Sequence, residues 1–382
     1  MDTERKAIPR KKKRHWDIFL AILFIGALSM SGVIFTLLDI FEESDIEITM
    51  VYGSEKRAWI EEVGPGFAAW WKSQHDQRVK LEFFPLGSRE SMTNILNRAS
   101  SPTIWSPASS IWIPLLNWQW DQLYGGNLVE ASNWAPLVRS PVVIASWEDY
   151  IQDKNVTGFQ SLNTLAADAN SDLRYAHTDP QLSNSGFMAV IMQATVAAGK
   201  SNTSEVVLED LKDSDVKDWM RRLESRAVFY GKSTGFLAEQ AINAGPETLN
   251  AFITYENLVI DSNKKGTPSA RWKQRLQAIY PSEGVLLTDH PFCILSGDWV
   301  SDEEKEVAQG LLEYLLLEDI QSKAMDHGFR PISSSVQLDT SIFNESNGVI
   351  ADPWSEVPLF STDGIDAEVL WRIPDLWLAT KK

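Results

Sequence analysis

The side chains in this chain that could bind a small molecule are mostly hydroxyls, and they gather where an expected strand turns into an expected helix. Four such turns occur, at 53–54, 105–110, 178–186 and 254–257. A turn of this kind points backbone N–H groups and the positive end of a helix dipole at whatever lies in front of it. The chemistry that this pattern favours is binding of an anion or of another hydrogen-bond acceptor.

The elements that must position these turns alternate between strand and helix. Residues 46–52 and 79–84 have the composition of strands, the segments that follow each of them are expected helices, and a third strand is expected at 103–105. Units of this length imply a parallel sheet with helices on its faces. Two longer apolar runs, at 140–146 and 284–295, are typical of crossings between two lobes.

The most informative stretch is 280–331, which predicts a turn, a buried strand or strand pair and then a helix. Ser301 and Glu304 have the spacing of a capping box. Behind them the apolar residues recur at helical spacing, and the helix is expected to end at Gly328, a residue that tolerates the left-handed C-cap conformation. This run, with its Gly328-Phe329-Arg330-Pro331 turn, resembles the type II periplasmic binding proteins, the two-lobed solute receptors of ABC importers.

The resemblance spans about residues 46–335 and implies an α/β fold. Two lobes would be joined by a hinge of two crossover strands, preceded by one transmembrane helix. The first lobe would comprise 46–140 and 290–382, and the second lobe 141–289. Solute would bind in the cleft between them, and closure would be a rigid-body swing of one lobe toward the other.

The resemblance also points to individual residues in the four turns. The candidate ligand-binding residues are Ser54, Ser106, Ser109, Ser110, Asp179, Ser183, Ser185, Gly186 and Tyr255. Each has a structural interpretation as well, because serine at a helix start is an ordinary N-cap and Asp179 before Pro180 is typical of a turn. A fifth turn of the same kind, with weaker support, lies at 233–235.

The class of ligand stays open between an oxyanion, a sugar and a peptide. Glu256 would repel an anion, so either it faces away from the cleft or the ligand carries a positive or hydroxyl group. Tryptophan is abundant, with 16 residues. Indole faces can stack on sugars, although core packing explains them too. Trp112, Trp118 and Trp120 could instead form an exposed patch for a membrane partner.

The function implied by the resemblance is capture of a small solute and its delivery to a transporter permease. The alternative is a sensory or interaction ectodomain of the same fold that works with other neighbouring membrane proteins. The expected cytoplasmic tail is too short for a folded output domain, so signalling would need a partner in trans.

Motifs of common enzymes are missing from the sequence, and we expect no catalytic activity, no cofactor and no metal. There is no Gly-x-Ser-x-Gly elbow, no His-Glu-x-x-His and no phosphate-binding loop. The five histidines show no pair at the spacing of zinc ligands. His177 lies close to Asp179 and Ser185, but local sequence alone cannot build a catalytic triad.

The N-terminus predicts a membrane anchor. Residues 1–16 hold seven Lys/Arg against two acidic residues, 18–38 hold no charge, and acidic residues follow. This pattern favours a cytoplasmic tail at 1–16, a transmembrane anchor at 17–40 and an ectodomain outside the cell or in the periplasm. A cleaved signal peptide is the alternative, although its apolar core is usually shorter.

The body of the chain is acidic. The net charge is −17, and with +5 in residues 1–16 the remainder carries −22. An acidic body has no electrostatic footprint for nucleic acid, which we exclude as a partner. Cys293 is the only cysteine, so no intramolecular disulfide forms and the fold must be stabilised by its hydrophobic core.

Overall fold

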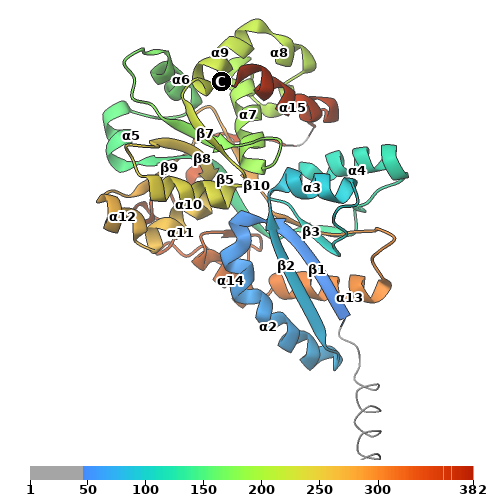
Figure 1. Ribbon diagram of the computed structural model, residues 1–382. Helices are drawn as coiled ribbons and strands as arrows, with labels where there is room; N and C mark the ends of the chain where they lie inside the picture. The colour runs from blue at the N-terminus through green and yellow to red at the C-terminus, as the bar shows by residue number, and fades with distance from the viewer. Residues whose placement is uncertain (1–45, 356, 363, 382) are drawn as a thin grey trace, which may run out of the picture. The chain divides into compact units, whose positions relative to one another are not determined.

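The computed structural model describes residues 46–355, 357–362 and 364–381, drawn as a coloured ribbon in Figure 1. The predicted tail at 1–16 and the predicted anchor at 17–40 lie outside the described residues. Among the helices that are described, none combines the length and the apolar content that crossing a membrane requires.

The first lobe is built on a sheet whose described strands follow the order β2 (Val79–Leu86), β1 (Ile46–Gly53), β3 (Ile104–Ser106), β11 (Pro291–Ile294) and β4 (Trp134–Pro136). Strand β1 is parallel to β2 and β3, whereas β11 is antiparallel to β3 and β4. The helices of this lobe are η1 (Ser54–Lys56), α2 (Arg57–His75), α3 (Ser88–Leu96), α4 (Trp112–Tyr124), α13 (Asp302–Leu315) and α14 (Glu318–Asp326).

Helix α13 has the cap that the sequence predicts. The Glu304 amide donates to Ser301 Oγ at 3.1 Å, and the Ser301 amide donates to Glu304 Oε2 at 2.7 Å. The apolar face of α13 is buried against the sheet and α2. Gly328 has a φ of +80° after the end of α14, and its left-handed conformation turns the chain toward Arg330.

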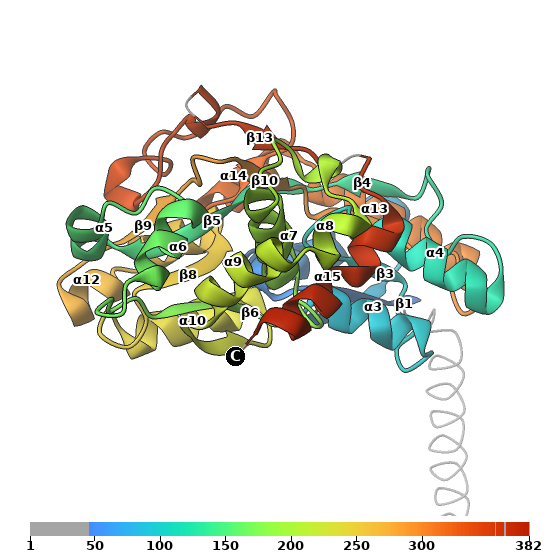
Figure 2. The ribbon, with the colours of Figure 1, turned by 90° about the horizontal axis from the view of Figure 1, so that it is seen from above.

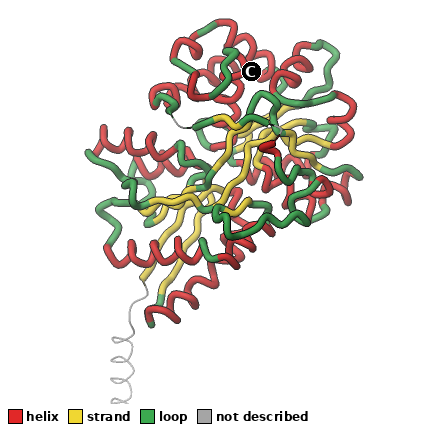
Figure 3. Tube along the Cα trace, turned by 180° about the vertical axis from the view of Figure 1, so that it is seen from behind, coloured by secondary structure: helices red, strands yellow, loops and turns green. Residues whose placement is uncertain are grey.

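The second lobe is built on a larger sheet with the described strand order β13 (Leu359–Phe360), β10 (Val285–Thr288), β5 (Val138–Trp147), β8 (Ala251–Tyr255), β6 (Tyr175–Thr178) and β7 (Ala227–Gly231). Strands β9 (Leu276–Ile279) and β12 (Arg330–Pro331) also pair with β5. The helices are α5 (Glu148–Lys154), α6 (Phe159–Ala167), α7 (Asn184–Ala197), η2 (Thr203–Glu205), α8 (Leu208–Lys212), α9 (Ser214–Glu224), α10 (Thr234–Ala244), α11 (Glu256–Lys264), α12 (Thr267–Trp272), η3 (Glu345–Asn347), η4 (Pro353–Ser355) and α15 (Ala367–Thr380). Figure 3 shows the strands in the middle of the described body and helices around them.

The chain passes between the two sheets at the positions of the two predicted crossings. It leaves the first sheet after β4 and continues directly into β5, and it returns from β10 to β11. The predicted α/β fold with two lobes is therefore confirmed. Cys293, in β11, is buried and free.

The end of the chain departs from the predicted lobe boundaries. Strand β12 pairs with β5 and β13 pairs with β10, so the chain returns to the second sheet after α14. Helix α15 then packs on α7, α8 and α9, as Figure 2 shows. The expectation that 290–382 belongs entirely to the first lobe does not fit these contacts, because the buried face of α15 joins the core of the second lobe.

The lobes share a hydrophobic core on one side. Trp112 of α4 packs on Phe187 of α7 with ring centroids 4.5 Å apart. Trp118 packs on Trp371 of α15 at 5.9 Å. Core packing of the tryptophans fits this arrangement and the alternative of an exposed patch does not, because Trp112 is 0% and Trp120 6% exposed, and of the three only Trp118, at 40%, reaches the surface.

Candidate functional site

The hydroxyls of three helix starts meet at the boundary between the two lobes. Ser54 Oγ, in η1, donates to Ser233 Oγ at 2.9 Å and accepts from the Gly235 amide of α10 at 3.2 Å. Next to Ser233, Thr234 Oγ1 donates to Ser185 Oγ of α7 at 2.9 Å. The turn that follows β1 is thus hydrogen-bonded directly to the second lobe.

The neighbouring candidates in the second lobe have structural partners. The Gly186 amide donates to Thr178 Oγ1 at 2.7 Å, and a Cβ at Gly186 would lie 1.8 Å from the Thr178 carbonyl oxygen. Glycine is needed there because α7 begins in direct contact with the end of β6. Ser183 Oγ lies 3.2 Å from Thr234 Oγ1. Asp179 Oδ1 accepts from the Gln181 amide at 2.7 Å, the turn-stabilising role of an Asx-turn.

Serines of the turn after β3 are also hydrogen-bonded to protein groups. Ser109 Oγ accepts from the Ile111 amide at 3.4 Å, and the Ser110 amide donates to Asp289 Oδ1 at 2.8 Å. Ser106 Oγ is buried and has no hydrogen-bond partner among the described residues. Ser106 is thus a buried hydroxyl of this turn whose bonding capacity is left unused.

Tyr255, at the end of β8, faces the first lobe. Its hydroxyl accepts from Asn184 Nδ2 at 2.8 Å, and Asn184 Oδ1 accepts from Trp112 Nε1 at 2.7 Å. The Tyr255 ring packs edge-on against His290, with centroids 5.7 Å apart. Tyr255 therefore contacts protein groups of both lobes.

A buried ion pair fills the space between the turns after β1 and β3. Lys56 is 0% exposed, and its Nζ donates to Glu55 Oε1 at 2.9 Å and to the Pro107 carbonyl oxygen at 3.2 Å. His290 Nδ1 lies 3.2 Å from the same Glu55 oxygen. Burial opposes charge on Glu55, but Lys56 and His290 outweigh it and lower the pKa of Glu55 to about 2. The sequence did not predict this pair, because nothing in the local pattern shows that Lys56 points inward.

Glu256 faces away from the cleft, so its carboxylate would not repel an anion bound there. It forms a two-pronged ion pair with Arg330, with Nε–Oε2 and Nη2–Oε1 distances of 2.7 Å each. It also accepts a hydrogen bond from the Tyr280 hydroxyl. Glu256 therefore stabilises the fold and places no charge in the cleft.

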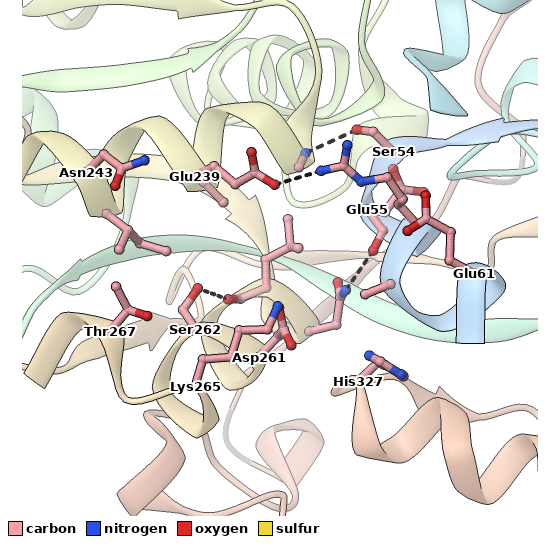
Figure 4. Close-up of a pocket in the computed structure, with 17 residues that line it drawn as sticks. Ser54, Glu55, Glu61, Glu239, Asn243, Asp261, Ser262, Lys265, Thr267 and His327 are labelled. Atoms are coloured by element: carbon pink, nitrogen blue, oxygen red, sulfur yellow. Dashed lines mark hydrogen bonds and ion pairs between the residues drawn. The ribbon is translucent and has the colours of Figure 1, made fainter. Parts of the chain in front are cut away.

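An open cavity of about 420 Å³ lies beside the hydroxyl contacts, between η1 and α2 of the first lobe and α10 and α11 of the second. Figure 4 shows Ser54, Glu55 and Glu61 on one wall and Glu239 and Asn243 on another. The α11 wall is formed by Asp261, Ser262 and Lys265, and His327 lies at the α14 end. Of the candidate ligand-binding residues, only Ser54 lines this cavity.

Three contacts between the lobes border the cavity. One is the Gly235–Ser54 hydrogen bond at 3.2 Å. The second is an ion pair between Arg57 Nη2 and Glu239 Oε1 at 2.7 Å. In the third, Asn257 Nδ2 donates to the Glu55 carbonyl oxygen at 3.4 Å. All three contacts must break if the lobes separate here, so the cavity is lined by groups whose spacing depends on lobe closure.

His177 takes part in a different buried cluster and does not meet Ser185 or Asp179 through its ring. Its Nδ1 lies 2.7 Å from the Thr178 carbonyl oxygen, and its Nε2 lies 3.1 Å from Glu224 Oε1. Both ring nitrogens face acceptors, which suits a charged imidazolium. A hydrolase triad is thus not formed, and the described residues contain no group of His, Cys, Asp or Glu able to hold a metal ion.

We expect the His177–Glu224 pair to make stability depend on pH. Burial disfavours the charged imidazolium, but Glu224 outweighs burial and raises the pKa of His177 above 6.5. Burial also disfavours the charged carboxylate, but His177 outweighs burial and lowers the pKa of Glu224 below 4.5. The raised pKa of His177 contributes fully to the stability of the fold below pH 6.5, and this contribution is lost as the pH rises through the folded-state pKa. The lowered pKa of Glu224 contributes to the stability of the fold above pH 4.5, and this contribution is lost as the pH falls through the folded-state pKa.

The contribution of the pair is therefore largest between about pH 4.5 and 6.5. Urea unfolding followed across this range should show His177→Gln losing more stability there than at pH 8. An equal loss at every pH would contradict a charged pair.

Known protein families were compared with the whole chain. Residues 48–330 match the family of bacterial extracellular solute-binding proteins. The chain belongs to this family. Its members capture small solutes outside the cytoplasm and deliver them to ABC transporters, and they are not enzymes.

Solved structures show the same fold for this solute-binding protein. The periplasmic binding protein P5PA has a TM-score of 0.61 at 14% identity, covering 88% of this chain and 100% of that chain. AfuA from Actinobacillus pleuropneumoniae, with fructose-6-phosphate bound, has a TM-score of 0.61 at 13% identity, covering 88% and 99%. A periplasmic thiamin binding protein has 0.60 at 13%, covering 90% and 98%. No curated protein sequence matches the chain.

Proposed function

We propose that this receptor binds its solute in the cavity between η1–α2 and α10–α11. The observation that supports the proposal is a cavity of about 420 Å³ lined by residues of both lobes. This volume lies in the usual range for small-molecule sites, about 300–1,000 Å³. Contacts with both lobes are what a solute needs in order to favour the closed arrangement.

The contacts across the cavity give closure a physical basis. The Gly235–Ser54 and Arg57–Glu239 contacts form only when the two lobes approach here. A solute held between the walls adds its own contacts to both lobes and shifts the population toward this closed state. The other candidate ligand-binding residues do not line this cavity and would not contact a solute bound there.

We further propose that residues 17–40 anchor the receptor in the membrane with residues 1–16 in the cytoplasm. An apolar segment that follows a basic tail favours this orientation. The anchor would raise the effective concentration of the receptor at the permease of an ABC transporter.

A second candidate function has one observation in its favour. The space between the turns after β1 and β3 is filled by Lys56, Glu55 and His290, all buried. A receptor that fills the space between these two turns with its own side chains fits an interaction ectodomain that signals through neighbouring membrane proteins. In that case no small solute would bind the cavity.

A substitution that fills the cavity separates the two functions. Ala58 is exposed on α2 and lines the cavity, so Ala58→Trp should obstruct it without disturbing a core. Melting temperature is measured against amines, sugars, amino acids, oxyanions and short peptides. A ligand at a hundredfold excess over its Kd stabilises the native state by about 2.7 kcal/mol.

We expect a stabilising ligand to lose its effect on Ala58→Trp and to keep it on Ala131→Trp, a matched change at an exposed loop residue away from the cavity. A flat response of the unaltered protein to every class would favour the interaction ectodomain. Equal stabilisation of both variants would place the solute elsewhere.

A further inference from the structure

The backbone donors that an anion would use at this interlobe boundary are already bonded to protein oxygens. The Arg89 and Glu90 amides at the start of α3 both donate to the Leu182 carbonyl oxygen, at 3.1 and 3.0 Å. The Asn257 amide at the start of α11 donates to Ser140 Oγ at 3.1 Å. At the start of α10, the Gly235 amide donates to Ser54 Oγ. Binding of an oxyanion at a helix N-terminus depends on such N–H groups being free.

The charges around the cavity exclude anions for a second reason. The carboxylates that line it are Glu55, Glu61, Glu239 and Asp261. Three of them have a cation of their own: Lys56 at 2.9 Å from Glu55, Arg57 at 2.7 Å from Glu239, and Lys265 at 2.6 Å from Asp261.

Glu61 is the carboxylate that remains uncompensated. It receives no hydrogen bond or ion pair from any residue that the structure describes, and Figure 4 shows it on the α2 wall. The histidine on the lining, His327, is engaged by Glu62, with Nε2–Oε2 at 2.7 Å. The cavity therefore presents one unpaired negative charge and no unpaired positive charge among its described residues.

We infer that the solute of this cavity carries a positively charged nitrogen, an ammonium or guanidinium group, and that Glu61 is its counter-ion. The inference rests on the proposed function, since it names the class of solute for the same cavity. An opposite charge at hydrogen-bond distance is attracted at every plausible local dielectric, whereas a sulfate, phosphate or carboxylate would be repelled by Glu61. The Glu61 carboxylate would accept hydrogen bonds that only a donor-bearing ligand can supply.

The test uses the full chain, purified in a mild detergent, and calorimetric titration. The probes are putrescine and agmatine as cations, glucose and maltose as neutral ligands, and sulfate and phosphate as anions. We expect a cation to bind, Glu61→Gln to weaken it at least tenfold, and added salt to weaken it as well. Glu303→Gln is the same change at an exposed position of α13, away from the cavity, and it should leave the affinity unaltered.

Three other outcomes would contradict the charge of the solute, the role of Glu61 or the cavity itself. Binding of a sugar or an anion that Ala58→Trp abolishes, without binding of either cation, would overturn the inferred charge and leave the proposed cavity standing. Cation binding that Glu61→Gln does not change would overturn the role of Glu61. Absence of binding by every probe would count against both the inferred charge and the cavity as a solute site.

Discussion

Replacing Arg330 by methionine is expected to lower the free energy of unfolding by about 3–5 kcal/mol, because it leaves the Glu256 carboxylate buried without a counter-charge. Arg330 is 7% exposed and Glu256 0%. The guanidinium also donates to the carbonyl oxygens of Ala351 and Ile350, at 2.8 and 2.9 Å. The substitution should therefore loosen the segment after β12 as well as α11.

Equilibrium unfolding in guanidinium chloride measures this loss. Arg372→Met is the matched control, because it breaks an exposed ion pair, with Arg372 Nη1 3.0 Å from Asp375. Exposed pairs contribute about 0–1 kcal/mol, so the control should unfold nearly as the unaltered protein does. Adding Glu256→Gln to Arg330→Met should recover part of the loss, since it removes the buried charge. Similar losses for Arg330→Met and Arg372→Met would contradict the buried pair.

Lys56→Met should be destabilising by a similar amount, about 3–5 kcal/mol, for the same physical reason. Without Lys56 the Glu55 carboxylate keeps only the His290 contact at 3.2 Å, and burial would raise its pKa from the present value of about 2. Because Glu55 follows Ser54 directly, the change should also disturb the turn that contacts α10. The measurement is unfolding as a function of pH.

The double variant Glu55→Gln/Lys56→Met separates loss of the ion pair from loss of packing. It removes both charges, and replacing both partners of a buried pair is often close to neutral. We expect it to be more stable than Lys56→Met alone. A double variant that is less stable than either single change would show that the side-chain shapes, and not the charge balance, determine stability here.

The sequence predicted those features that depend on neighbours along the chain. The capping box of Ser301 and Glu304 forms because both residues lie within one helical turn. The alternation of strands and helices follows from hydrophobic periodicity, which decides which face of each element is buried. The turns at Ser54 and Ser185 were expected at helix starts, and both are found there.

Other features depended on residues that are far apart in sequence. Glu256 could face the cleft or turn away, and its partner Arg330 lies 74 residues later. Helix α15 was expected in the first lobe, but its apolar face fits α7, α8 and α9. Nothing in the local pattern indicates which of several apolar surfaces a helix will cover.

By itself the sequence determined the two-lobed α/β fold, the family and the gathering of hydroxyls at strand-to-helix turns. Only the tertiary structure decided that Ser54 bonds to Ser233, 179 residues away, and that Lys56 turns inward to pair with Glu55. It also decided that Glu61 is left unpaired beside the cavity. The physical reason is that periodicity specifies which side of an element is buried, whereas the partner of a polar side chain depends on distant segments that meet only when the lobes pack.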